Sequence, residues 1–124
     1  MPSSIIGILG NTKVWESELV NGIATITSGI FKIEHNSGYF SAWLKATSVA
    51  GVPTLRVFYE MSYDDTPANF ATPNGFPDIV AALAVETVQI YQFTPPYLPY
   101  IRFKITGNAG NPVDTLITMQ LCTQ

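Results

Sequence analysis

Apolar and polar residues alternate with a period of two along most of the chain, which is the pattern of β-strands that bury one face. The clearest alternations lie in residues 101–106 and 117–122, each with three apolar side chains on one face. Between them, residues 107–114 contain two glycines, two asparagines and a proline, which indicate a loop. We therefore expect residues 97–124 to form an antiparallel hairpin whose apolar face is covered by other strands.

The same alternation recurs earlier in the chain, in segments separated by turn residues. Residues 39–48 and 54–63 each place one set of side chains on a common face: Phe40, Ala42, Leu44 and Ala46 in the first, and Leu55, Val57, Tyr59, Met61 and Tyr63 in the second. Strands are also expected at 23–27, 30–34 and 86–93, with a bulge at Ser28-Gly29, while residues 79–85 fit a helical turn or a strand. Strands at this spacing without an amphipathic helix predict an all-β fold, an antiparallel β-sandwich of jelly-roll-like topology.

The first twenty residues are less regular than the rest. We divide the chain into an N-terminal arm or edge strand, residues 1–20, and a β-sandwich domain, residues 21–124. The apolar residues of the first segment form either a strand of their own domain or an arm that docks on a neighbouring subunit; they are Ile5, Ile6, Ile8 and Leu9. Trp15 is followed by Glu16 and Glu18, so we expect it at a rim and not deep in the core.

Charged residues make up 12% of the chain, about half of what is typical of soluble domains. Because interface cores are depleted in charge, this composition favours a protein that meets other subunits, although a stable secreted β-domain has the same property. The net charge is −3, and the six basic residues are scattered without forming a patch that could follow a phosphate backbone. We expect no binding to nucleic acid.

Several other classes are disfavoured. The single cysteine, Cys122, excludes an internal disulfide and a cysteine-based metal site, and is expected to be a small apolar filler. The N-terminus has no basic region before its short apolar run, and no apolar run approaches the roughly 18 residues that span a bilayer. We expect a protein made in the host cytoplasm without a signal peptide, with no membrane partner and no cofactor.

Candidate chemistry is sparse. His35 is the only histidine and stands in a turn, and no nucleophile elbow, phosphate loop or metal-binding helix motif is present, so we expect no catalytic residue and no enzyme activity. Asp64, Asp65, Asn69 and Asp78 could hold calcium, but such residues also begin turns, and we expect no metal. The aromatic residues could stack on sugar rings, but cores and interfaces use them more often.

Residues 64–78 break the strand pattern with three prolines and an Asn-Gly turn, and long loops of this kind are commonly functional or interfacial. We expect this loop to contact a neighbouring subunit, because prolines lower the entropy lost on docking. The candidate contact residues in it are Asp64, Asp65, Pro67, Phe70, Pro73, Phe76 and Pro77.

Two stretches carry a resemblance to a known class: residues 100–118, YIRFKITGNAGNPVDTLIT, with the end of the chain at Gln124, and residues 59–65, YEMSYDD. They are similar to small β-sandwich virion proteins of tailed bacteriophages, over about two-thirds of the chain. The resemblance implies a capsid decoration or accessory subunit in the virion, bound to copies of itself and to other virion proteins such as the major capsid protein. The Tyr-x-Arg-x-Lys-x-Thr-Gly pattern also resembles discoidin-like jelly rolls, which implies a carbohydrate-binding module as the alternative.

Overall fold

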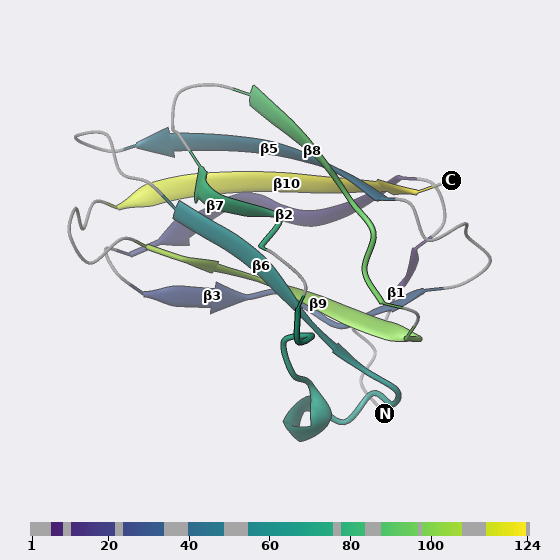
Figure 1. Cartoon of the computed structure of the whole chain (residues 1–124). Helices are drawn as coiled ribbons and strands as arrows, with labels where there is room; N and C mark the ends of the chain where they lie inside the picture. Colours follow the sequence, from purple (N-terminus) through teal and green to yellow (C-terminus); the bar gives the residue numbers. More distant parts are fainter. Residues whose placement is uncertain are drawn as a thin grey trace.

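The computed structural model of the chain describes residues 6–8, 11–21, 24–33, 40–48, 55–75, 78–83, 88–96, 98–107 and 114–123. In these residues the chain forms two β-sheets packed face to face, with one short 3-10 helix, η1 (Pro67–Asn69), in a loop (Figure 1). The expected all-β, jelly-roll-like sandwich is confirmed.

The larger sheet has six strands. Its order is β1 (Ile6–Ile8), β4 (Phe31–Ile33), β9 (Tyr100–Thr106), β6 (Leu55–Ser62) and β7 (Val80–Leu83), and β3 (Thr25–Thr27) pairs with β9 as well. Neighbours are antiparallel except for β1 and β4, which are parallel. Residues 79–85, which fitted either a helical turn or a strand, contain strand β7.

The smaller sheet has four antiparallel strands in the order β2 (Asn11–Val20), β10 (Thr115–Thr123), β5 (Phe40–Ser48) and β8 (Val88–Phe93). Strands β9 and β10 therefore lie in different sheets, and the expected hairpin over residues 97–124 is wrong. The period of two indicates that each strand buries one face. Two such strands can pair in one sheet or lie in two sheets that face each other, and the pattern is the same in both cases. The connection of residues 107–114 links the two layers.

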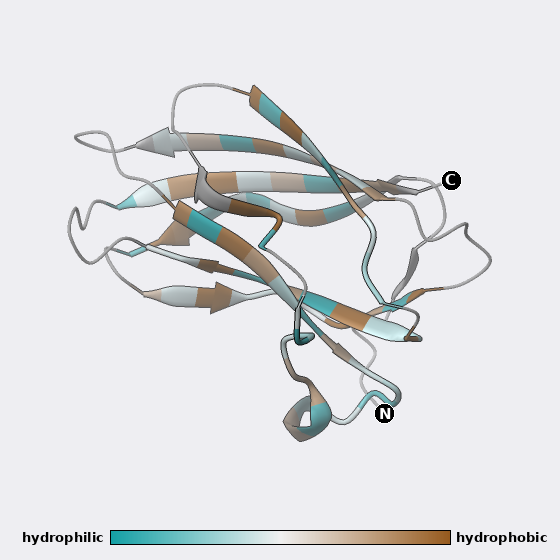
Figure 2. Ribbon diagram, viewed as in Figure 1, coloured by the Kyte–Doolittle hydropathy of each residue, from teal (hydrophilic) through white to brown (hydrophobic). Residues whose placement is uncertain are grey.

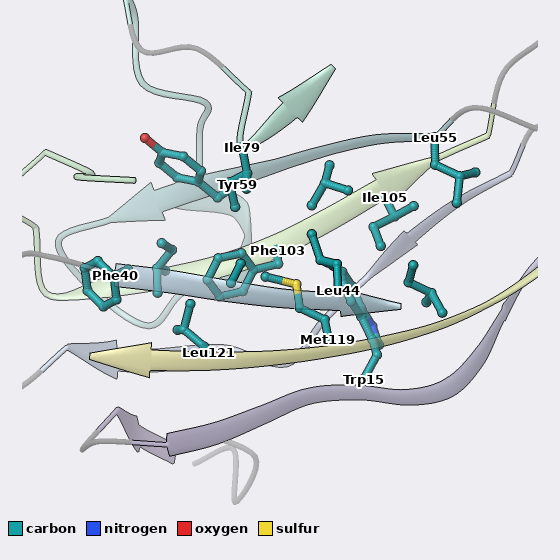
Figure 3. Close-up of a cluster of buried hydrophobic side chains, with 14 of the residues drawn as sticks. Trp15, Phe40, Leu44, Leu55, Tyr59, Ile79, Phe103, Ile105, Met119 and Leu121 are labelled. Carbon is teal, nitrogen blue, oxygen red and sulfur yellow. The ribbon is translucent and has the colours of Figure 1, made fainter. Parts of the chain in front are cut away.

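The predicted apolar faces meet between the sheets (Figure 3). Fully buried side chains come from both layers, among them Phe103, Ile105, Leu44, Met119 and Leu121. Aromatic rings pack around Phe93, whose centroid lies 5.4 Å from Phe40, 5.6 Å from Tyr59 and 6.2 Å from Phe103. Tyr63, expected on the buried face, is instead 73% exposed, because β6 ends at Ser62.

Strand β2 departs from the simple alternation. Its pairing with β10 shifts register on both sides of Met119, which lies opposite Trp15, and each shift places an extra residue in β2. Ser17 has φ 48°, and its backbone N–H donates to Thr118 Oγ1 at 3.0 Å. These bulges turn Trp15 into the core, where it is 7% exposed, while Glu16 and Glu18 stay exposed. The expected rim position of Trp15 is wrong for this reason.

A second irregularity lies between β3 and β4, at the position where a bulge was expected. Ser28 interrupts the ladder, and its backbone N–H donates to the carbonyl of Phe103 at 2.8 Å. The Ser28 hydroxyl accepts the N–H of Phe103 at 2.8 Å and donates to the carbonyl of Gly29. A side chain thus replaces a missing backbone acceptor, so that β3 and β4 both run beside β9.

Of the two expectations for residues 1–20, the described residues form edge strands: β1 borders the six-stranded sheet and β2 borders the four-stranded sheet. A contact between this segment and a neighbouring subunit stays a prediction. Within the described part of the chain, no helix has the length and apolar character needed to cross a membrane.

Candidate functional site

The predicted contact residues fall into two groups. Ile6 and Ile8 belong to β1, at one border of the six-stranded sheet, and the loop that joins β6 to β7 holds Asp64, Asp65, Pro67, Phe70 and Pro73. Ile5, Leu9, Phe76 and Pro77 lie outside the described residues, as does His35. The structure therefore describes five of the seven predicted residues of the loop.

The Asp64 carboxylate organises the first half of this loop. Its Oδ1 accepts the backbone N–H of Thr66 at 3.1 Å and the Ser62 hydroxyl at 3.2 Å, and both of its oxygens accept from Asn69 Nδ2, at 3.2 and 3.0 Å. Desolvation raises the pKa of Asp64, but the hydrogen bonds from Thr66, Asn69 and Ser62 outweigh it, so the pKa lies below its ordinary value. The 3-10 turn of η1 is thereby tied to the end of β6.

Phe70 fixes the loop to the sheet. Its side chain is 8% exposed, and the Arg102 guanidinium lies over its ring, 4.7 Å from the centroid. Next to it, Ala71 forms a two-bond bridge with Met61, with N–O distances of 2.9 and 3.1 Å. Phe70 is an internal anchor and not a surface contact.

The surface of the loop consists of other residues. Tyr63 is 73% exposed, and Pro67, Ala68 and Asn69 are also exposed. The sequence pattern missed Tyr63 because strict alternation continued β6 by one residue too many. The loop thus presents an aromatic ring and a proline on a backbone that Asp64 and Phe70 hold in place.

Two of the three carboxylates that suggested calcium, Asp64 and Asp78, have other partners. Asp78 accepts hydrogen bonds from Nε and Nη2 of Arg56, at 2.8 and 3.0 Å. Asp64 accepts hydrogen bonds from donors of its own loop. Within the residues that the structure describes, no group of three or more histidine, cysteine, aspartate or glutamate side chains could hold a metal ion.

Charges on the outer face of the six-stranded sheet are also paired. Glu60 Oε1 lies 2.7 Å from Arg102 Nη2, and its Oε2 lies 3.5 Å from Lys104 Nζ. Arg56, besides its contact with Asp78, lies over the ring of Phe58 at 4.0 Å. Because these charges already have partners, this face is poorly suited to bind a charged ligand.

The outer face of the four-stranded sheet is different in kind. Val88 is 48% exposed and Ile90 is 67% exposed, both on β8, and Leu19 and Leu116 are exposed on β2 and β10. Sequence reasoning missed this feature, although residues 88–93, VQIYQF, contain no charged residue and could have indicated it. Among the described residues, Tyr63 is the one aromatic side chain in the set of large, strongly exposed apolar residues, and Trp43 on β5 is partly buried.

No protein-family model and no curated protein matches the sequence. Among solved structures, the fold is similar to a part of tripeptidyl peptidase 2, with a TM-score of 0.65 and 8% identity over 94% of this chain and 10% of that one. It is similar to a chain of infectious bursal disease virus, Gt strain, with a TM-score of 0.55 and 16% identity over 91% of this chain and 30% of that one.

A third similar structure is close to this chain in length. PliG of Aeromonas hydrophila, a periplasmic inhibitor of g-type lysozyme, has a TM-score of 0.50 and 11% identity over 98% of this chain and 96% of its own. The chain spans only a tenth to about a third of the peptidase and virus chains. At these identities the likeness establishes the β-sandwich fold alone, because one fold hosts many functions.

Proposed function

We propose that the protein is a non-enzymatic structural component of a tailed-phage virion, a capsid decoration or accessory subunit that acts by binding neighbouring subunits. The observation that carries this proposal is the loop between β6 and β7. Asp64 and Phe70 hold its backbone, and it presents Tyr63 and Pro67 to solvent. A loop that is ordered before binding loses little entropy on docking, which favours a protein–protein contact.

Two further observations support the proposal. The sequence resembles small virion proteins of tailed phages in residues 100–118, with the end of the chain at Gln124, and in residues 59–65. The sandwich fold also occurs in a structure of T=1 particles derived from infectious bursal virus, with a TM-score of 0.54, 14% identity, and 91% of this chain covered. The partners that we propose are copies of the same chain and other virion proteins such as the major capsid protein.

The test is co-sedimentation with particles. Virions purified on a density gradient from a culture that carries the gene should contain the protein in a fixed ratio to the major capsid protein. Tyr63→Ala should reduce that ratio at least about tenfold, as expected for the loss of an aromatic contact residue. Leu19→Ala is the matched control, because Leu19 is also a large exposed side chain but belongs to the other sheet.

Two outcomes would refute the proposal. The first is absence of the wild-type protein from purified particles. The second, which refutes the assignment of the loop, is a Tyr63→Ala protein that remains folded and sediments with particles as fully as the Leu19→Ala control.

A further inference from the structure

The edges of the two sheets are protected unequally. An unpaired strand edge exposes a row of N–H and C=O groups, and proteins block such edges with short strands, charges, prolines or bulges. In the described part of the chain, the border strands β1 and β3 have three residues each and β7 has four. Strand β2 is long, but two register shifts and its charged residues Lys13, Glu16 and Glu18 break its edge.

Strand β8 has none of these devices. It is six residues long, Val88–Phe93, and it contains no charge, proline or glycine. Its pairing with β5 runs without a register shift, and no described strand pairs with its outer edge (Figure 1). Hydrophobic and hydrophilic residues alternate along it (Figure 2), and the outward residues include Ile90 at 67% exposure.

We propose that the outer edge of β8 pairs with β8 of a second copy of the chain, joining two four-stranded sheets into one continuous sheet of eight strands. The proposal deepens the proposed function, on which it rests, by assigning the self-association to a particular edge. A two-fold axis relates the two copies, so the contact closes as a dimer.

The sequence of β8 is complementary to itself. An antiparallel register with Ile90 on the axis places Ile90 opposite its copy, Val88 opposite Gln92, and Gln89 opposite Tyr91. Like charges directly opposite each other destabilise a strand pair. Because β8 has no charged residue, this cannot happen between its two copies in any register. Ile90 is a β-branched residue on the outer face and lies opposite its own copy, and a cross-strand pair of this kind stabilises a sheet.

In the described part of this face, the charge nearest to β8 does not oppose the pairing. Lys45 on β5 is the cross-strand partner of Val88. In the dimer the two β5 strands are separated by three strand spacings, about 14 Å. This exceeds the Debye length of about 8 Å at physiological ionic strength, so the repulsion between the two copies of Lys45 is largely screened.

Sedimentation velocity over a range of concentrations tests the dimer. The wild-type protein should show a reversible monomer–dimer equilibrium, and Ile90→Lys should weaken it at least about tenfold, because a lysine on an edge strand opposes pairing. Leu116→Lys is the matched control: Leu116 is exposed on the outer face of the same sheet, but β10 is paired on both sides by β2 and β5. It should leave the dimer intact, and thermal melting should confirm that both variants fold.

Cross-linking gives the geometry directly. In a Cys122→Ser background, Ile90→Cys should give a covalent dimer with a short bis-maleimide, and Leu116→Cys should not. A wild-type protein that stays monomeric overturns the proposal, and so does a Leu116→Lys variant that dissociates as readily as Ile90→Lys, which would indicate packing between sheet faces. A monomer that still sediments with particles refutes the edge pairing alone, whereas a dimer absent from particles refutes the proposed function alone.

Discussion

The outer faces of the two sheets differ although their inner faces are built alike. On the six-stranded sheet, Glu60 pairs with Arg102 and Lys104, and Arg56 pairs with Asp78. On the four-stranded sheet, the ion pair of Lys13 and Glu16 is exposed on the border strand β2, and the outer face also carries exposed apolar residues, which are Leu19, Val88, Ile90 and Leu116. Among the described residues, the partly buried ion pairs thus lie on the six-stranded sheet, and most of the large exposed apolar side chains lie on the four-stranded sheet.

The comparison bears on how the protein associates. Paired charges cancel each other at a distance, so the six-stranded sheet offers little field to steer a partner. A strand edge without charged residues pairs through burial and backbone hydrogen bonds, which salt screens weakly. The proposed association through β8 should therefore vary little between low and high salt.

The largest effect is expected in the core that both faces share. Phe103→Ala should lower the free energy of unfolding by about 3–5 kcal/mol, because the ring is fully buried and packs against Phe31 and Phe93. Leu44→Ala, on the facing sheet, should cost about 2–5 kcal/mol. Denaturant titration measures both, and a loss under about 1 kcal/mol for Phe103→Ala would contradict a core to which the two sheets contribute equally.

A smaller effect is expected on the ionic face. Glu60→Gln should cost about 1–3 kcal/mol, since it removes a charged acceptor from Arg102 and Lys104, all three side chains being mostly buried. Arg56→Gln should cost less, about 0–1 kcal/mol, because Arg56 is half exposed. The free energy of unfolding should be measured by urea titration at low and high salt. Equal losses of stability for the two variants would contradict the expected difference between the partly buried Glu60 contacts and the more exposed pair of Arg56 and Asp78.

A gain is expected at the bulge of β2. Ser17→Gly should raise the stability by up to about 1 kcal/mol, because φ 48° strains a residue with a Cβ atom and not glycine. Glu18→Gly, outside the positive-φ position, should instead lower the stability by about 0.5–1 kcal/mol. Thermal unfolding of the two variants side by side gives the sign of each, and a destabilised Ser17→Gly protein would show that the bulge is not strained.

The smallest effect concerns Asp64, whose hydrogen-bond donors are neutral, unlike those of Glu60. Its pKa is lower folded than unfolded, so its contribution to stability is fully present above the unfolded value of about 4. That contribution is lost as the pH falls through the lower pKa of the folded state. NMR titration of the Asp64 carboxyl and of the Thr66 amide should show both changing together below about pH 4. In Asp64→Asn the Thr66 amide should no longer titrate.

Much of the core follows from the sequence alone. The alternation in residues 40–46, 55–61, 101–105 and 117–121 identifies the buried side of each strand, because a period of two allows only two faces. The same rule cannot assign a strand to a sheet, which is why β9 and β10 seemed to pair with each other. Nor can it foresee a bulge, and two bulges in β2 turned Trp15 inward.

The loop was predictable in position but not in its roles. Its prolines and Asx residues mark residues 64–78 as irregular, and the structure agrees for residues 64–75 and 78. Which side chain faces inward depends on Arg102, 32 positions away from Phe70 in the sequence, and local patterns carry no such information. The position of β8 at the border of the described four-stranded sheet was equally hidden, since it follows from the order of the strands and not from any one of them.

The placement of β9 and β10 has a consequence for synthesis on the ribosome. Strand β9 joins β3 and β4 to β6, and β10 joins β2 to β5, so the larger sheet is not continuous before β9 exists and the smaller sheet is not continuous before β10 exists. At 5–20 residues per second, roughly 5–21 s separate the synthesis of residue 11 in β2 from that of residue 115 in β10. During that interval the nascent chain holds the apolar sides of β2, β5 and β6 without their central partners. Emergence of β10 from the ribosome is thus needed to complete the smaller sheet, and the predominance of contacts between residues distant in the sequence favours slow folding.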